Sequence, residues 1–174
     1  ALEFFEGVEE EEVIALGSAW KYLDDGSDLG ASDVVPGHPG YGALNWKHGE
    51  FDDAGWGRGA APLGYGRILG TTLNTTVSYG DDPAMRYRTT YFRKSFEVPN
   101  AARFSSLDLR ALRDDGVVIY LNGDEVMRSG FSAGSSVVTA ETLAAEQSSS
   151  SESTLFEAPV PLGLLQDGQN VITA

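Results

Sequence analysis

Several chemically important residue types are scarce or missing in this sequence of 174 residues: it has no cysteine and only two histidines, His38 and His48. The absence of cysteine excludes disulfide bonds, thiolate metal sites and cysteine nucleophiles, although it does not fix the cellular compartment. Neither histidine stands in a recognisable catalytic motif, and the sequence has no Gly-x-Ser-x-Gly elbow and no His-Glu-x-x-His zinc helix. We therefore predict that the chain is not an enzyme.

Basic side chains and long apolar runs are also in short supply. Twelve Lys and Arg stand against 26 Asp and Glu, which gives a net charge of −14. Such a surface repels phosphate backbones and anionic lipids, so we predict neither nucleic acid nor a membrane as a partner. No apolar run approaches the roughly 18 residues that would span a bilayer. Residues 1–6 lack the basic start and apolar middle of a signal peptide. If the natural protein is exported, its signal is expected to have been removed or to lie outside this sequence.

What the sequence does have is a high glycine content, with 21 residues, and long stretches of turn-forming residues. Residues 1–16 contain the acidic run Glu9 to Glu12, which indicates an acidic linker or a strand entrance. Residues 17–174 are predicted to form one β-sandwich domain. Their first part, 18–66, is irregular but rich in large aromatic rings, which is typical of long connections that buried rings hold on a core.

The second half of the chain has the alternation of strands. In 91–98, Phe92, Phe96 and Val98 share one face, on which Lys94 is the polar exception. The other face carries Arg93, Ser95 and Glu97. Further strands are predicted at 106–110, 117–121, 125–128 and 155–160, and a last one follows a turn within 164–172 and stops at Ala174. Asn122-Gly123 predicts a tight hairpin turn, because both residues tolerate positive φ. With no convincing amphipathic helix, the pattern predicts an all-β, antiparallel β-sandwich with long irregular loops in its N-terminal half. It leaves open that the last strand is truncated.

Six segments together resemble the galactose-binding-domain-like jelly rolls, and also the sugar-binding sandwich domains that precede many glycoside hydrolases. The segments are 50–56, 61–66, 90–96, 112–116, 120–126 and 168–172. The resemblance implies a jelly-roll fold and a non-catalytic accessory module of a large secreted bacterial protein. Its implied partners are a polysaccharide or glycan and the neighbouring domains of the parent protein. The alternative is a structural or protein-interaction domain of a secreted or cell-surface protein, without affinity for glycans.

Calcium is the cofactor that the sequence favours. The run Asp24-Asp25-Gly26-Ser27-Asp28 offers the oxygen ligands that hard cations prefer, and jelly rolls of the resembling type often carry a structural calcium ion. We therefore assign Asp24, Asp25 and Asp28 as candidate ligands, against the alternative of a plain Asp-Gly turn. Asp81-Asp82 is a second choice. Asp114-Asp115 is a third, although it is also read as a turn whose acids Arg113 could pair with.

A carbohydrate site would need an exposed aromatic ring to stack on a sugar and polar groups to bind its hydroxyls. Trp46 is the preferred platform, since it stands in an irregular stretch beside polar residues, and Tyr41 lies in the same insert. His48 and Arg113 are the candidate polar partners. An exposed Trp46 would favour glycan binding, whereas a buried Trp46 would favour the structural alternative.

Overall fold

The computed structural model describes residues 10–30, 45–66, 72–132, 137–145 and 154–174. Their regular secondary structure is almost all strand, apart from two short 3₁₀ turns, η1 (Ala101–Arg103) and η2 (Leu162–Leu164). The predicted all-β, antiparallel sandwich is confirmed. Within the described ranges, no helix has the length and apolar character needed to cross a membrane.

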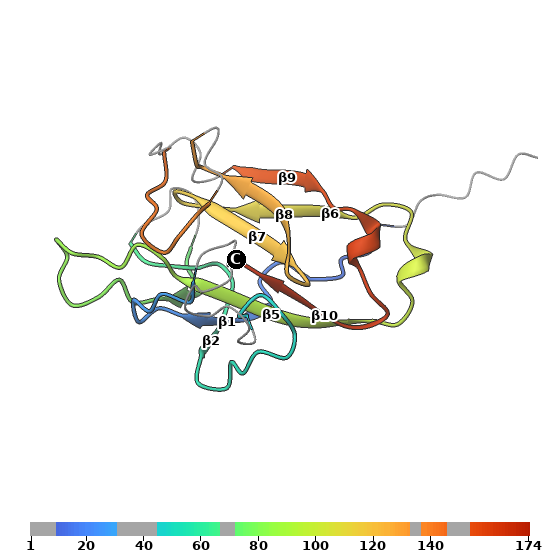
Figure 1. The fold of residues 1–174 in the computed structure, drawn as a ribbon, viewed down its shortest axis with the longest axis horizontal. Coiled ribbons are helices and arrows are strands. Elements are labelled where there is room, and N and C mark those ends of the chain that lie inside the picture. The colour runs from blue at the N-terminus through green and yellow to red at the C-terminus, as the bar shows by residue number, and fades with distance from the viewer. Residues whose placement is uncertain (1–9, 31–44, 67–71, 133–136, 146–153) are drawn as a thin grey trace, which may run out of the picture.

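The larger sheet has six strands in the order β2-β1-β5-β10-β7-β8, and every neighbouring pair is antiparallel. Its strands are β1 (Ala19–Leu23), β2 (Gly57–Ala60), β5 (Tyr91–Val98), β7 (Val117–Leu121), β8 (Asp124–Ser129) and β10 (Gly168–Thr173). A second, antiparallel pair consists of β6 (Asp108–Leu112) and β9 (Leu155–Pro159). Figure 1 shows β6 and β9 above β5 and β10, so that two layers face each other. The short strands β3 (Leu63–Gly64) and β4 (Thr75–Thr76) pair in parallel.

The hydrophobic core lies between these two layers. Val98, Leu121 and Leu165 are buried in one part of it, and Ile119 and Ile172 in another. Phe96, on the face of β5 that alternation assigned to the core, contacts both parts. The inward face of the sheet is therefore the one that the sequence pattern predicts.

Lys94 shares this inward face of β5, where a charged side chain is costly. Its ammonium group donates a hydrogen bond to the carbonyl of Ala19 at 2.9 Å. Burial, together with the nearby positive charge of Arg58, lowers the pKa of Lys94. Lys94 interrupts the apolar face of β5, and the hydrogen bond to β1 gives its ammonium group a partner there.

The opposite face of β5 is buried as well, because residues 45–53 lie across it. Trp46 contacts Tyr91 and Tyr120 edge-on, with ring centroids 4.9 and 5.9 Å apart. Arg93, which is only 1% exposed, lies on the same face of β5 as Tyr91, and its guanidinium packs over the rings of Phe51 and Trp56. A face that alternates with the core face would ordinarily meet solvent, but here a long connection covers it.

Arg93 holds this connection through all of its guanidinium nitrogens. Nη1 donates to the carbonyl of Trp46, Nη2 donates to the carbonyl of His48 at 3.0 Å, and Nε donates to Oδ2 of Asp53 at 3.0 Å. Lys21 on β1 binds the other oxygen of Asp53 at 2.6 Å. Because a buried guanidinium needs both a counter-charge and hydrogen-bond acceptors, residues 45–53 are bound to the sheet at both of their ends.

The turn between β7 and β8 is fixed to β10 by two asparagines. Asn122 and Gly123 have φ of 53° and 98°, so the predicted tight hairpin turn is confirmed. The Asn122 amide donates to the carbonyl of Leu164 and to Asn170 Oδ1, each at 2.8 Å, and its oxygen accepts from the Val171 amide at 2.9 Å. Asn170, 1% exposed, also bonds the backbone of Gln166. These bonds fasten η2 and the start of β10 to the β7–β8 turn.

The observed strands differ from the predicted ones mainly in the first half. The strands at 91–98 and 117–121 have the predicted bounds, and 106–110 is shifted to Asp108–Leu112. By contrast, β1 and β2 lie within the stretch that was expected to be irregular. The glycines of β2 hide its alternation, because Gly57 and Gly59 leave room for Tyr22 and Thr75 where side chains would otherwise stand.

The acidic segment before the domain is described from residue 10. Val13 and Ile14 contact the core, and Glu11 forms an ion pair with Arg103, with 2.5 Å between Glu11 Oε2 and Arg103 Nη2. The boundary placed after residue 16 stays a prediction.

Replacing Asn170 by alanine tests the asparagine network. We expect N170A to lower the free energy of unfolding by about 3 kcal/mol, because buried amide and carbonyl groups lose their partners. The matched control is Q169A, which removes an exposed amide from the neighbouring position and should cost less than about 0.5 kcal/mol. Urea unfolding measures both. Equal, small effects would contradict a structural role for the network.

Asp53 makes the stability depend on pH. Burial raises the pKa of its carboxyl, but hydrogen bonds from Lys21 and Arg93 outweigh burial, so the pKa lies below the ordinary 3.8. Because the folded-state pKa is depressed, the stabilising contribution is complete above about pH 4 and is lost as the pH falls through the folded-state pKa. We expect D53N to cost about 3 kcal/mol at pH 7, since it leaves the Arg93 charge without its counter-charge.

Urea unfolding of wild type and D53N from pH 7 to pH 2.5 measures this dependence. The difference between the two proteins should shrink in acid, where wild-type Asp53 is also neutral. D52N, which changes the exposed neighbouring acid, should resemble wild type at every pH. A difference between D53N and wild type that stays constant down to pH 2.5 would contradict the assigned role.

Candidate functional site

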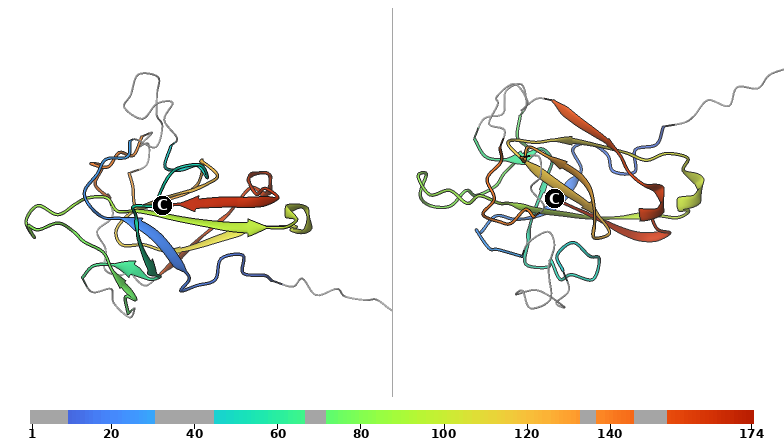
Figure 2. Two further views of the ribbon diagram at one scale, coloured as in Figure 1. Left: turned by 90° about the horizontal axis from the view of Figure 1, so that it is seen from below. Right: turned by 45° about the horizontal axis from the view of Figure 1, so that its top comes forward.

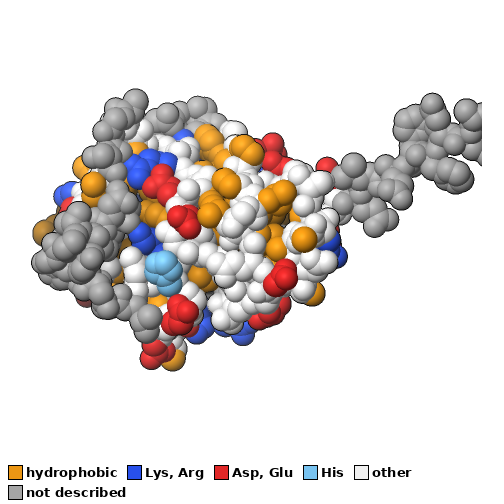
Figure 3. All heavy atoms as spheres, turned by 45° about the vertical axis from the view of Figure 1, so that its right-hand side comes forward, with side chains coloured by type: hydrophobic (Ala, Val, Ile, Leu, Met, Phe, Trp, Pro, Cys, Tyr) orange, Lys and Arg blue, Asp and Glu red, His pale blue; other side chains and the backbone are white. Residues whose placement is uncertain are grey.

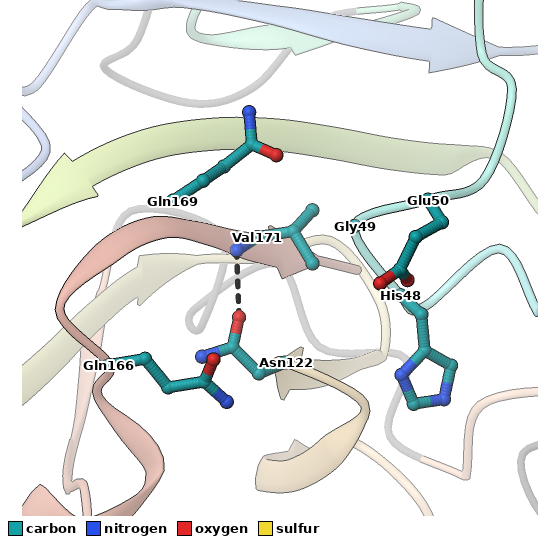
Figure 4. Close-up of a pocket in the computed structure, with 7 residues that line it drawn as sticks. All are labelled: His48, Gly49, Glu50, Asn122, Gln166, Gln169 and Val171. Carbon is teal, nitrogen blue, oxygen red and sulfur yellow. Dashed lines mark hydrogen bonds between the residues drawn. The ribbon is translucent and has the colours of Figure 1, made fainter.

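A pocket of about 240 Å³ opens beside the connection that Arg93 holds. Three segments that are distant in the sequence meet there: residues 48–50, the β7–β8 turn, and the stretch from η2 into β10 (Figure 4). It is lined by His48, Gly49, Glu50, Asn122, Gln166, Gln169 and Val171. The pocket is therefore built where the Arg93 contacts and the asparagine network come together.

His48 is positioned from two sides. Its carbonyl accepts the hydrogen bond from Arg93, and its ring lies against the backbone of Gly123. A Cβ at residue 123 would stand 2.3 Å from Cε1 of His48, so a side chain there would displace the ring. Gly123 is thus required both by its positive φ and by the approach of the imidazole.

The polar groups at the base of the pocket already have hydrogen-bond partners: the backbone N–H and C=O of Val171 both bind Asn122. Val171 lies at the base, and the hydrogen bond from its amide to the Asn122 oxygen is visible in Figure 4. Since the Asn122 side chain already has partners for its oxygen and its nitrogen, it supports the pocket rather than offering a group to a ligand.

The walls of the pocket, by contrast, offer unused polar groups. No residue described in the structure forms a hydrogen bond with the side chains of His48, Glu50, Gln166 or Gln169, all of which are exposed. Together they can donate and accept hydrogen bonds, and among the described residues no Lys or Arg lines the pocket. Figure 3 shows a histidine at the surface with acidic side chains nearby. This arrangement suits an uncharged molecule with several hydroxyl groups better than an anion.

Of the four predicted sugar-binding residues, His48 lies at this pocket. Tyr41 falls outside the described residues. Trp46, the preferred platform, is buried: it is 6% exposed, and its ring packs on Tyr91 and Tyr120, which is the outcome that favours the structural alternative. Because the residues of 45–53 are held on the sheet by Arg93, the indole serves as a core side chain of the outer face and not as a surface platform.

Arg113 is also buried, at 5% exposure, and lies away from the pocket lining. Its guanidinium stands 4.3 Å from the ring centre of Phe156, while Nε donates to Ser129 Oγ at 2.8 Å and Nη1 donates to the carbonyl of Asp115. Arg113 therefore joins β6, β8 and β9 to the Asp114-Asp115 turn. Of the two readings that the sequence left open for these acids, the structure favours a turn.

The three candidate calcium ligands do not gather. Asp24 accepts a hydrogen bond from the Ser78 amide, Asp25 from Ser27, and Asp28 from the Gly30 amide. The side chain and the backbone of Ser27 both hold the pKa of Asp25 below its usual value. Within the described ranges, no three Asp, Glu, His or Cys side chains are grouped so as to hold a metal ion. These aspartates fit a set of turns tied by backbone amides rather than a three-carboxylate calcium site.

Sequence reasoning did not single out Glu50, Gln166 and Gln169 as pocket residues. Glu50 starts a segment that was noted only for its resemblance, and the two glutamines stand in what reads as an ordinary turn before a strand. No local signal brings these segments together, because their approach depends on Arg93 and on the two asparagines.

Comparison with known proteins leaves the family open. No family model matches the chain, and no curated protein does. Among solved structures, it is similar to a β-glucuronidase of an uncultured Clostridium sp., at 20% identity and a TM-score of 0.49, over 99% of this chain and 23% of that one. A β-glycosidase from Bacteroides vulgatus gives 15% identity and a TM-score of 0.48, over 94% and 17%. The chain spans less than a quarter of these proteins, and this similarity does not assign it to a family.

Proposed function

We propose that this chain is a non-catalytic accessory module of a secreted, multidomain bacterial protein, and that it binds uncharged carbohydrate in the pocket beside His48. The observation that carries the proposal is the convergence of four polar side chains without described partners, from two separate segments, on one pocket. Surface glutamines and glutamates that only solubilise a protein have no reason to converge in this way.

The size and charge of the pocket narrow the ligand class. Its volume of about 240 Å³ lies below the range of roughly 300–1,000 Å³ that is typical of small-molecule sites, which suits a single sugar ring at the end or side of a chain. Glu50 is the charged group in the lining, and the chain carries a net charge of −14. Uronates and sulfated sugars would be repelled, so neutral glycans are favoured.

The alternative, a structural or protein-interaction domain without glycan affinity, is favoured by one observation. Trp46, the large aromatic ring expected to contact a sugar, is a core residue. In that case residues 45–53 would serve only to cover the sheet, and the pocket would be a gap between segments. The same binding experiment separates the two functions.

The calcium component of the sequence-based expectation stays a prediction. Thermal melting in calcium chloride and in EDTA is its direct measure, because an ion that binds the native state alone raises the apparent stability.

Affinity gel electrophoresis tests the carbohydrate proposal. We expect the wild-type protein to be retarded in at least one gel containing galactan, xyloglucan, laminarin or hydroxyethyl cellulose, and not in a gel containing polygalacturonate. E50A and Q169A should each weaken binding about tenfold, because each removes hydrogen bonds to the ligand. E157A, an exposed acid on β9 in the other layer, is the matched control and should bind as wild type. Absence of retardation in every neutral gel would favour the alternative function.

A further inference from the structure

A second group of polar and aromatic side chains lies in and beside the loop that joins β4 to β5. This loop projects from one end of the molecule in Figures 1 and 2. We call the group the tyrosine surface; it consists of Tyr65, Tyr79, Arg86 and Tyr87. None of these residues belongs to the hydrophobic clusters of the core within the described chain. Core packing therefore does not account for them.

Three members of the tyrosine surface form one stacked unit. The ring centres of Tyr65 and Tyr79 are 5.1 Å apart with their planes tilted by 52°, and the guanidinium of Arg86 lies 5.7 and 5.3 Å from them. The Arg86 Nε donates to the carbonyl of Pro83 at 3.2 Å. Such cation–π contacts hold a long side chain in place at the surface, which lowers the entropy that binding a ligand would cost.

Tyr87 is positioned by the backbone on which it lies. A Cβ on Gly26 would stand 2.7 Å from its ring and one on Gly80 3.2 Å, so both glycines, each with positive φ, make room for the ring. Hydrogen bonds from the Ser78 amide to Asp24 and from the Tyr87 amide to the carbonyl of Tyr79 fasten the two loops together. Even so, 36% of Tyr87 stays exposed.

The surroundings of this ring match the needs of sugar recognition. An exposed ring can pack on the apolar face of a pyranose, and nearby carboxylates and guanidinium groups can bind its hydroxyls. Gly26 lies directly beside the ring, and Asp25 and Ser27 are its neighbours in the sequence. Arg86 directly precedes Tyr87. The exposed aromatic side chain that sequence analysis sought at Trp46 is thus present at Tyr87.

We propose that the tyrosine surface is a second carbohydrate-contact surface, on which Tyr87 packs against an uncharged pyranose ring of a polysaccharide. This inference rests on the proposed function for the class of ligand, but not on the pocket, because the two sites share no residue. A polysaccharide that contacts the protein at both sites would be retained longer than one that contacts it at either site alone.

The experiment is affinity gel electrophoresis of the whole chain in the four neutral polysaccharides, with variants at each site. Y87A should weaken binding about tenfold, and Y87F, which keeps the ring, should bind within about twofold of wild type. M85A is the matched control, since Met85 is 77% exposed in the same loop and is not part of the surface. Melting temperatures verify that Y87A is folded. If Y87A is unfolded, the binding of Y87F becomes the test. Loss of binding in Y87F overturns the stacking role of the ring.

The outcomes separate the two proposals. If E50A weakens binding and Y87A, folded, binds as wild type, the tyrosine surface is overturned and the pocket stands. If Y87A weakens binding and E50A does not, the second surface stands and the pocket is overturned. Loss in both variants, with M85A and E157A unchanged, supports both sites. Wild-type protein that none of the four gels retards overturns both.

Discussion

The structure depends above all on one buried positive charge. Placing the Arg93 guanidinium at 1% exposure is costly, and the cost is offset only because Asp53 supplies a counter-charge and two backbone carbonyls accept its remaining hydrogen bonds. Those carbonyls belong to residues 46 and 48, so the same contacts that satisfy the charge fix the course of the chain. The indole of Trp46 is thereby turned onto the sheet, and the imidazole of His48 toward the pocket.

Because of this contact, the centre of the large sheet is buried on both faces. The inner face meets β6 and β9, and the outer face meets residues 45–53, so Asn170 to Thr173 in β10 are all buried. Such a strand cannot alternate between polar and apolar residues in the usual way. Its polar members are Asn170 and Thr173. Both polar atoms of the Asn170 side chain form hydrogen bonds, whereas the buried Thr173 hydroxyl has no partner among the described residues.

The sequence predicts the parts of the fold that local patterns determine. The bounds of β5 follow from alternation, those of β7 from a continuous apolar run, and the turn at Asn122-Gly123 from tolerance of positive φ. All three are properties of neighbouring residues. The course of residues 45–53 does not follow from any such pattern, because it is set by an arginine far along the chain. For the same reason the sequence leaves open whether Trp46 is exposed or buried, and of the residues that line the pocket only His48 is among its candidate sugar-binding residues.

One feature of the strand order bears on how the molecule resists opening. In the described chain β10 alone joins the half of the sheet made by β2, β1 and β5 to the half made by β7 and β8. If this strand detaches, two unpaired edges are created at the middle of the sheet, and each could recruit a strand from another molecule. The asparagines that clamp the start of β10 therefore act as a safeguard against self-association, in addition to shaping the place where a ligand would bind.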